Sequence, residues 1–293
     1  MRADAFSKQH PAVNFLFFMG AIISTMLIQH PAYLLVGMIC GGAYYLLLHG
    51  HEGLKLILGM IPMFFVLTFI NPLFNTYGDT VLFTYFNRPY TLEALLYGGA
   101  VAAVFVEMLL WFGCYNAVLT SDKFTSLFGN LIPALSLLLV MVLRMIPNFM
   151  RKAQQISGAR SSIGKGTAEQ DSIRDKLMEG MTVLGALTSW ALEGSIVTAD
   201  SMRSRGYGTA KRSSFMLYTM TSIDSALLLS EILLPILVII FGDTTATYTP
   251  VYYIAPIKGI RGLGLIFYTV YLLIPTILHI KEAAQWRISI SKI

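Results

Sequence analysis

The sequence predicts an all-α membrane protein, a multi-span helical bundle that also carries long amphipathic helices in water. Of its 293 residues, 55% are hydrophobic and only 13% are charged, whereas soluble domains carry about 25% charged residues. The mean hydropathy of +0.65 agrees, because lipid-facing surface needs no charge and a charge at the bilayer centre is costly. The net charge of +5 comes from basic residues clustered between 144 and 212 and at the C-terminus, so we do not expect nucleic-acid binding.

Six apolar runs are long enough, or nearly so, to cross a bilayer, which takes about 20 residues. The runs are Val13–Ile28, Ala32–Leu48, Leu54–Ile70, Leu92–Val118, Phe215–Phe241 and Ile260–Ile280. His30-Pro31 predicts a turn and Asn71-Pro72 predicts a helix end, because proline disfavours helix at the residue before it. Residues 73–90 mix polar and aromatic side chains, which predicts a loop or short hairpin at the outer interface.

Composition divides the chain into three segments. Residues 1–121 hold the first apolar runs, residues 122–212 hold cytoplasmic or interfacial helices, and residues 213–293 hold the last two runs and a basic tail. Basic residues beside spans mark the cytoplasmic side, so the middle segment and the C-terminus are predicted to be cytoplasmic, in a polytopic protein of the cell (inner) membrane.

A further apolar stretch, Leu131–Ile146, conflicts with this topology, because a fifth crossing puts the basic segment outside. We expect that residues 122–149 do not cross, since Pro133 interrupts them and Arg144 is costly in lipid. The segment then lies obliquely or re-enters, buried against protein. The alternative is that the N-terminus lies outside.

A long helix is predicted from Asp171 to Arg205, with Asp171 as its N-terminal cap. Apolar residues recur at steps of three and four, which places them on one stripe. The stripe includes Ile173, Leu177, Met181, Leu184, Leu187 and Trp190, and Met202 adds a flexible side chain near its end. Two interpretations remain: a surface that packs against another helix, with Met181, Leu184, Leu187 and Met202 in the contact, or an amphipathic helix on the membrane surface.

Two helix ends in the middle segment carry arginine between small residues. One end is Ala159-Arg160-Ser161, followed by Gly164, and the other is Arg203-Ser204-Arg205-Gly206. Gly206 is a natural C-cap and arginine is favoured at a helix C-terminus, so capping explains the second of these ends. A docking tip explains it equally well, because arginine pairs with carboxylates in two directed hydrogen bonds.

Other candidate chemistry is sparse. Glu107 is the carboxylate expected deep in the membrane, where an ionisable group marks a functional site or a buried pair, and Arg144 is its candidate partner. No metal site or catalytic constellation is expected: His49 and His51 lack a third ligand, and Gly164-Lys165-Gly166 lacks the phosphate-loop spacing. A self-sufficient secondary transporter is the alternative function, although we find no internal repeat of the kind such proteins carry.

Several motifs give the chain its resemblance to a known family. Ser201 to Gly208, with Arg-Ser-Arg-Gly-Tyr at 203–207, resembles the second arginine motif of the transmembrane T component of energy-coupling factor (ECF) transporters. Ala159-Arg160-Ser161 takes the place of the first motif, with serine where the family commonly has glycine. Leu143-Arg144-Met145-Ile146-Pro147 and Asn71-Pro72-Leu73-Phe74 resemble two further family segments, and the order is kept over residues 10–282.

The resemblance implies a non-catalytic coupling subunit of an ATP-driven importer of a vitamin or metal ion. Its expected partners are two ABC-type ATPase subunits and a small membrane S component that captures the substrate. The residues implied in ATPase coupling are Ala159, Arg160, Ser161, Arg203, Ser204, Arg205 and Gly206. ATP and Mg²⁺ are expected on the partner ATPases, with no cofactor bound by this chain itself.

Overall fold

A computed structural model describes residues 5–76, 78–85, 88–129, 133–166, 172–209, 218–248, 253–257 and 259–290. The chain forms two compact units. Unit 1 comprises Met1–Phe124 and Tyr218–Ile293, and unit 2 comprises Thr125–Leu217. The predicted cap Asp171 and the basic residues Lys211 and Arg212 lie outside the described residues.

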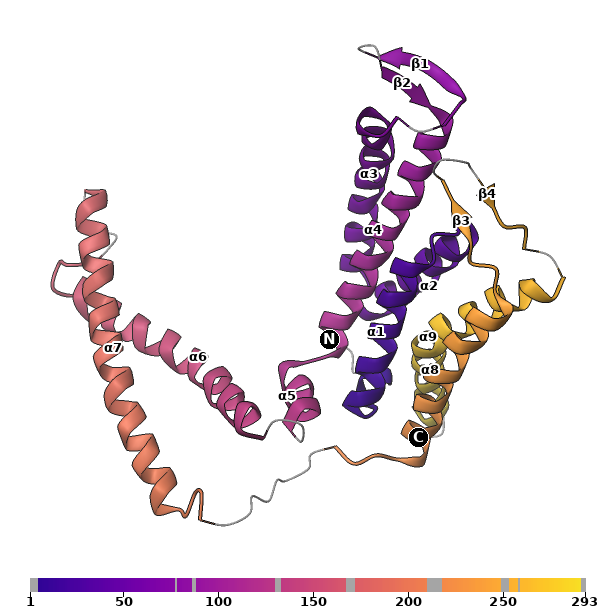
Figure 1. The fold of residues 1–293 in the computed structure, drawn as a ribbon. Helices are drawn as coiled ribbons and strands as arrows, with labels where there is room; N and C mark the ends of the chain where they lie inside the picture. The colour runs from indigo at the N-terminus through magenta and orange to yellow at the C-terminus, as the bar shows by residue number, and fades with distance from the viewer. Residues whose placement is uncertain are drawn as a thin grey trace. The chain divides into compact units, whose positions relative to one another are not determined.

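Unit 1 is a bundle of apolar helices (Figure 1). Its helices are α1 (Pro11–Leu27), α2 (Pro31–His49), α3 (His51–Phe74), α4 (Leu92–Val118), α8 (Ser222–Phe241) and α9 (Gly262–Ile290). In the described part of the chain five of them, α2, α3, α4, α8 and α9, are long and apolar enough to cross a membrane, and α1 is a shorter apolar helix of 17 residues. These helices confirm the predicted multi-span helical membrane protein.

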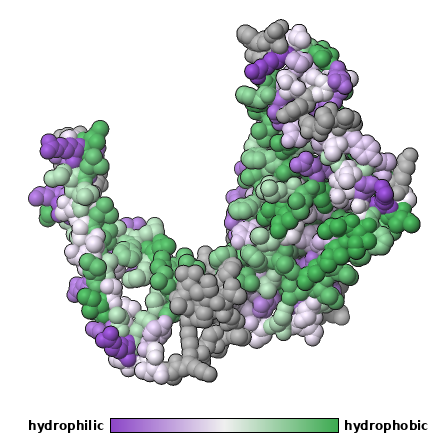
Figure 2. All heavy atoms as spheres, viewed as in Figure 1, coloured by the Kyte–Doolittle hydropathy of each residue, from purple (hydrophilic) through white to green (hydrophobic). Residues whose placement is uncertain are grey.

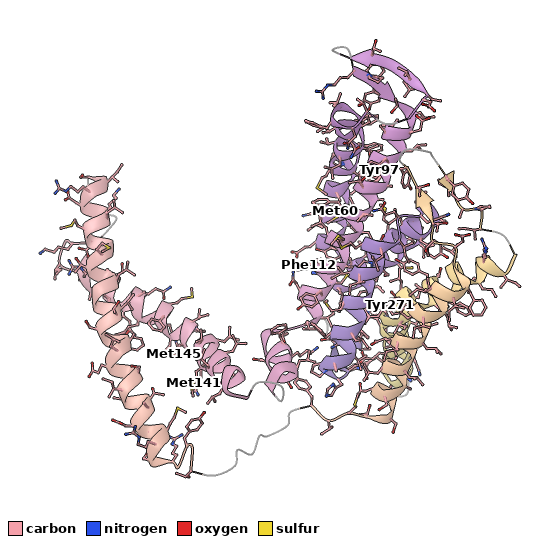
Figure 3. The ribbon with its side chains drawn as sticks, viewed as in Figure 1. Met60, Tyr97, Phe112, Met141, Met145 and Tyr271 are labelled. Atoms are coloured by element: carbon pink, nitrogen blue, oxygen red, sulfur yellow. The ribbon has the colours of Figure 1, made fainter. Side chains whose placement is uncertain are left out.

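Hydrophobic residues cover much of the visible surface of this unit (Figure 2). The apolar window of α3 is only 6% buried within the chain, which suits a helix whose side chains face lipid. The interior is aromatic instead: Phe17 of α1 lies between Trp111 of α4 and Tyr271 of α9, with ring centroids 5.7 and 5.2 Å away. Figure 3 shows Tyr271 projecting from α9 within the bundle.

Histidine and proline together start the first two helices. Pro31 is the first residue of α2, and the side chain of His30 accepts a hydrogen bond from the Ala32 amide. His10 caps α1 in the same way. The turn predicted at His30-Pro31 is therefore present, because proline occupies the one helical position that needs no N–H.

The predicted end of α3 at Asn71-Pro72 is wrong, because the helix continues to Phe74. Pro72 has no N–H to donate to the carbonyl of Thr68, four residues earlier. That carbonyl lies against Gly98 of α4, where an added Cβ would sit 2.6 Å from it. The backbone of α4 thus packs closely over the carbonyl that lacks this helical hydrogen bond.

One end of the bundle gathers the N-terminal segment with the start of α8 and the last part of α9. The Asp224 carboxylate accepts a hydrogen bond from the His10 amide at 2.9 Å, and Lys8 forms an ion pair with Glu282. The Lys123 amine donates to the Ser7 hydroxyl at 2.8 Å. The chain therefore leaves the bundle after α4 and returns at α8 at the same end.

The opposite end holds two short hairpins, of which the sequence predicted the first as a loop or short hairpin and did not predict the second. Strands β1 (Val81–Tyr85) and β2 (Arg88–Thr91) pair antiparallel between α3 and α4, where a loop or hairpin was predicted. Strands β3 (Ala246–Thr247) and β4 (Tyr253–Ile254) pair between α8 and α9. The Tyr248 hydroxyl donates to the Gln29 carbonyl at 2.9 Å, which ties the second hairpin to the turn between α1 and α2.

Four apolar helices precede α5 (Ser121–Gly129): α2, α3 and α4 are long and apolar enough to span, and α1 is the shorter one. Helix α6 (Pro133–Ser161) is not among the helices that are long and apolar enough to span. The expectation that residues 122–149 do not cross stays a prediction. Pro133 is the first residue of α6, so the predicted interruption separates α5 from α6.

The contact between Gly37 of α2 and Glu107 of α4 gives a test of the bundle. A Cβ at Gly37 would lie 1.9 Å from the Glu107 carboxylate, whereas a Cβ at Gly42 of the same helix meets nothing within 4 Å. We expect Gly37→Ala to lower stability by about 1–3 kcal/mol through overpacking. Unfolding of the purified protein in detergent measures this, with Gly42→Ala as the matched control; equal stability of the two variants would contradict the packing described.

Candidate functional site

Unit 2 contains two long helices, α6 and α7 (Ile173–Ser204), which cross and run in opposite chain directions (Figure 1) and contact each other. Arg160 near the end of α6 pairs with Glu179 near the start of α7. Farther along, Phe149 packs edge-on against Trp190 with ring centroids 5.5 Å apart, and the Lys152 amine lies 5.8 Å from the centre of the Trp190 ring. These contacts fix the angle and register of the helix pair.

The first helix end folds back over itself. Gly164 has a φ of +71°, and its amide donates to the Ser161 carbonyl at 3.0 Å while the Lys165 amide donates to the Arg160 carbonyl at 3.0 Å. This pair of bonds is a Schellman cap, which satisfies the last helical carbonyls and favours glycine because of the positive φ. The sequence analysis noted Gly164 after this helix end but did not predict that it forms the cap.

The second helix end repeats this cap. Gly206 has a φ of +78°, and its amide donates to the Arg203 carbonyl at 3.0 Å while the Tyr207 amide donates to the Met202 carbonyl at 3.1 Å. The predicted cap at Gly206 is confirmed. At the other end of α7 the Ser172 side chain accepts from the Arg174 amide, so Ser172, rather than the predicted Asp171, is the N-cap.

The arginines of the two ends differ in their surroundings. Arg160 donates to Glu179 through Nε and through Nη2, the second bond at 2.6 Å. The side chains of Arg160 and Glu179 are 27% and 8% exposed. Arg203 and Arg205 are exposed, and within the described residues neither forms an ion pair.

The ion pair between Arg160 and Glu179 also shifts the pKa values of both side chains. Hydrogen bonding to Glu179 raises the pKa of Arg160, and hydrogen bonding to Arg160 holds the pKa of Glu179 below its ordinary value. Both groups therefore stay charged near neutral pH, and the first end carries a fixed ion pair. The second end carries two cations that no carboxylate of the described residues neutralises.

The two ends lie far apart along α7. Glu179 marks the first end and Ser204 the second, and at 1.5 Å per residue the helix between them measures about 38 Å. The structure therefore does not bring Arg160 and Arg205 into one site. Instead it presents two separate capped helix ends, each with arginine beside small residues: Ala159 and Ser161 at the first end and Ser204 and Gly206 at the second.

The apolar stripe of α7 is largely uncovered within the chain. Met181 and Leu184 are 67% and 58% exposed, so they do not form a core with α6. Leu187 and Met202 are half-buried. Among the described residues of the stripe, Trp190 packs its ring against Phe149 of α6. Most of this face is therefore available to a partner or to lipid.

Glu107 is fully buried in unit 1, where α1, α2, α4 and α9 converge. Its carboxylate accepts from the Thr25 hydroxyl at 2.7 Å and from the Tyr268 hydroxyl at 3.5 Å. These neighbours, together with Gly37, favour a structural role that joins four helices. Arg144, the other candidate intramembrane polar residue, is exposed on α6 next to Met145, which Figure 3 labels.

Sequence reasoning missed two carboxylates. Glu231 of α8 is 3% exposed, and neither of its oxygens has a hydrogen-bond partner among the described residues, so Glu107 is not the one deep carboxylate. Its position inside an apolar run was the available signal. Glu179 was missed because its partner lies 19 residues away on another helix. Within the described residues, no group of three histidine, cysteine or acidic side chains is placed to hold a metal ion.

Comparison with known proteins gives one family match. The profile of the CbiQ family, described as cobalt transport protein, matches residues 4–217. The match includes α1 to α7 and therefore both arginine-bearing helix ends. No curated protein shows significant similarity to the chain.

The cap at Gly206 yields a local prediction. Alanine at a left-handed φ costs about 1 kcal/mol or more, so Gly206→Ala should loosen the end of α7 and speed hydrogen exchange of the Tyr207 amide about fivefold. Hydrogen-exchange mass spectrometry over residues 200–209 measures this. Gly194→Ala, inside α7 with open space around it, is the control and should not speed exchange; a similar response in both variants would contradict the capping role.

Proposed function

The chain belongs to the CbiQ family of cobalt transport proteins, the transmembrane T components of ECF transporters, and from this premise we propose that it is the coupling subunit of an ATP-driven importer. In this role it links two ABC-type ATPase subunits to a small membrane S component that captures the substrate. The substrate is a vitamin or a metal ion, and cobalt is the ion that the family description names. ATP and Mg²⁺ bind to the ATPases rather than to this chain.

The observation that carries this proposal is the repeated helix end. Two ends share the same glycine cap, carry arginine and lie about 38 Å apart along α7, at 1.5 Å per residue. A single partner groove does not reach both ends, whereas two ATPase subunits can take one end each. Arginine suits such grooves because its planar fork binds carboxylates in two directed hydrogen bonds.

The proposed orientation puts the helix pair in the cytoplasm. The basic residues of α6 and α7 and the basic C-terminal tail then face the cytoplasm, as basic residues beside spans usually do. If all four apolar helices before α5 cross, the N-terminal segment with Lys8 lies on the same side as the helix pair, which fits this orientation. ATPases dissolved in the cytosol can reach the two helix ends only in this arrangement.

Transport then follows from a two-state change of the helix pair. ATP binding closes the ATPases, the two docked ends move with them, and the angle between α6 and α7 changes. The exposed apolar face of α7, with Met181 and Leu184, transmits this change to the membrane partners, because methionine and leucine side chains repack at low cost. The S component reorients and releases its substrate inside.

The buried carboxylate of Glu231, which has no hydrogen-bond partner among the described residues, favours a second candidate, a self-sufficient secondary transporter. Reconstitution separates the two functions. The purified chain alone in proteoliposomes should take up no substrate, and it should need both the ATPases and the S component. Ion-driven uptake by the chain alone would favour the second candidate.

Charge reversal at the helix ends tests the proposed docking. Arg205→Glu and Arg160→Glu should each weaken ATPase binding at least about tenfold, because losing a desolvated charge pair costs about 2 kcal/mol or more. Purification in mild detergent from native membranes measures how much ATPase stays with each variant.

Arg151→Glu serves as the control, because Arg151 is exposed on α6 away from both ends. It should retain ATPase as the unmodified chain does. All three variants should insert into membranes equally well, since none lies in an apolar helix of unit 1. Normal ATPase retention by the Arg160→Glu/Arg205→Glu double variant would refute the docking proposal.

A further inference from the structure

Glu179 occupies one edge of the Arg160 guanidinium and leaves another edge open. Its two carboxylate oxygens accept from Nε and Nη2 of Arg160. Arginine has five N–H donors in a fixed planar fork, and within the described residues Nη1 and the second hydrogen of Nη2, on the end-on edge, have no acceptor. That edge has the geometry to bind a second carboxylate while the carboxylate of Glu179 occupies the edge formed by Nε and Nη2.

The burial of the pair supports a fixed guanidinium. Glu179 is 8% exposed and Arg160 is 27% exposed, so the carboxylate lies inside the α6–α7 corner while part of the arginine reaches the surface. The chain after α6 folds over this corner: the Lys165 amide bonds to the Arg160 carbonyl, and Gly166 is buried against Ser161. A side chain held from behind in this way presents its outer edge in one direction.

The second helix end lacks such a support. Arg205 is exposed, and no carboxylate of the described residues pairs with it or with Arg203. The two ends therefore share a backbone cap, but only the first end holds its arginine side chain in place with a carboxylate of the described residues. An ordered side chain loses less conformational entropy on binding than a free one.

We propose that Glu179 is a positioning residue for docking, which orients Arg160 so that its open edge meets a carboxylate in an acidic groove of one ATPase subunit. This inference rests on the proposed function and adds the residue that makes the first docking end rigid. It also makes the two ends unequal: the first binds preordered, and the second orders its arginines as it binds.

A double-mutant cycle tests the role of Glu179. The probe is the pair of ATPase subunits that purifies with the unmodified chain, added back to full-length variants in detergent. Arg160→Ala should weaken their binding at least tenfold. Glu179→Ala should weaken it about two- to tenfold, the range expected for leaving one side chain to be ordered on binding.

Because Glu179 acts through Arg160, the double variant Arg160→Ala/Glu179→Ala should bind as weakly as Arg160→Ala and no more weakly. A merely structural role predicts additive losses, so additivity would overturn the inference. So would Glu179→Ala binding at the unmodified level while Arg160→Ala is defective. Glu193→Ala is the control, because Glu193 is an exposed carboxylate on α7 with no ion pair in the described residues, and it should leave binding unchanged.

Two further variants keep the result interpretable. If Glu179→Ala does not fold, Glu179→Gln keeps the size of the side chain and should still weaken binding, whereas Glu179→Asp keeps the charge and should recover part of the affinity. If Arg160→Ala binds normally, the inference fails. Arg205→Glu then tells whether the proposed function fails with it, because that variant removes the second end alone.

Discussion

The bilayer imposes the constraint on which the rest of this structure depends: a chain that crosses it in pairs of helices must return to the side from which it started. Helices α1 to α4 make two such pairs, and α8 and α9 make a third. The contacts of one bundle end bear this out, because His10 meets Asp224, Lys8 meets Glu282 and Ser7 meets Lys123. The long segment between α4 and α8 is thus anchored at both of its ends on one side.

The same constraint separates two kinds of surface. The core of unit 1 is rich in aromatic rings, and its outer faces carry large apolar side chains, both aliphatic and aromatic, since lipid rather than water is their solvent. Buried polar groups are few and matter for packing: Glu107 takes hydrogen bonds from Thr25 and Tyr268, and it fits only because Gly37 has no side chain. Unit 2 is different, because its helices carry charges that water or a partner protein must solvate.

Local chemistry explains how far the sequence predicted the fold. Leu92–Val118 matches α4 residue for residue, since a long, mostly apolar run between a capping threonine and a polar break has few alternatives. Gly206 was predicted as a cap because glycine tolerates a positive φ. The predicted end of α3 was wrong because the helix accommodates Pro72. The Thr68 carbonyl, to which Pro72 has no N–H to donate, packs against Gly98 of another helix, and a local sequence pattern does not show contacts of that kind.

The candidate site was predicted in its parts but not in its pairing. Arg160 and Arg205 were both identified from the small residues around them, yet the sequence treated them as equivalent. Their difference arises from Glu179, which lies on α7 and reaches Arg160 of α6 in the same register that pairs Phe149 with Trp190. Glu231 was overlooked for a related reason, since an acidic residue in an apolar run gives no indication of what surrounds it.

Labelling of engineered cysteines from the two sides of the membrane tests the central claim most directly. The native Cys40 and Cys114 are buried at 4% and 0% exposure, so they contribute little background. With a membrane-impermeant maleimide on intact cells, Asp79→Cys at the hairpin end should be labelled, whereas Ser161→Cys and Ser204→Cys should react only after permeabilisation. Labelling of either helix end from outside would contradict the account, because no cytosolic ATPase could then reach it.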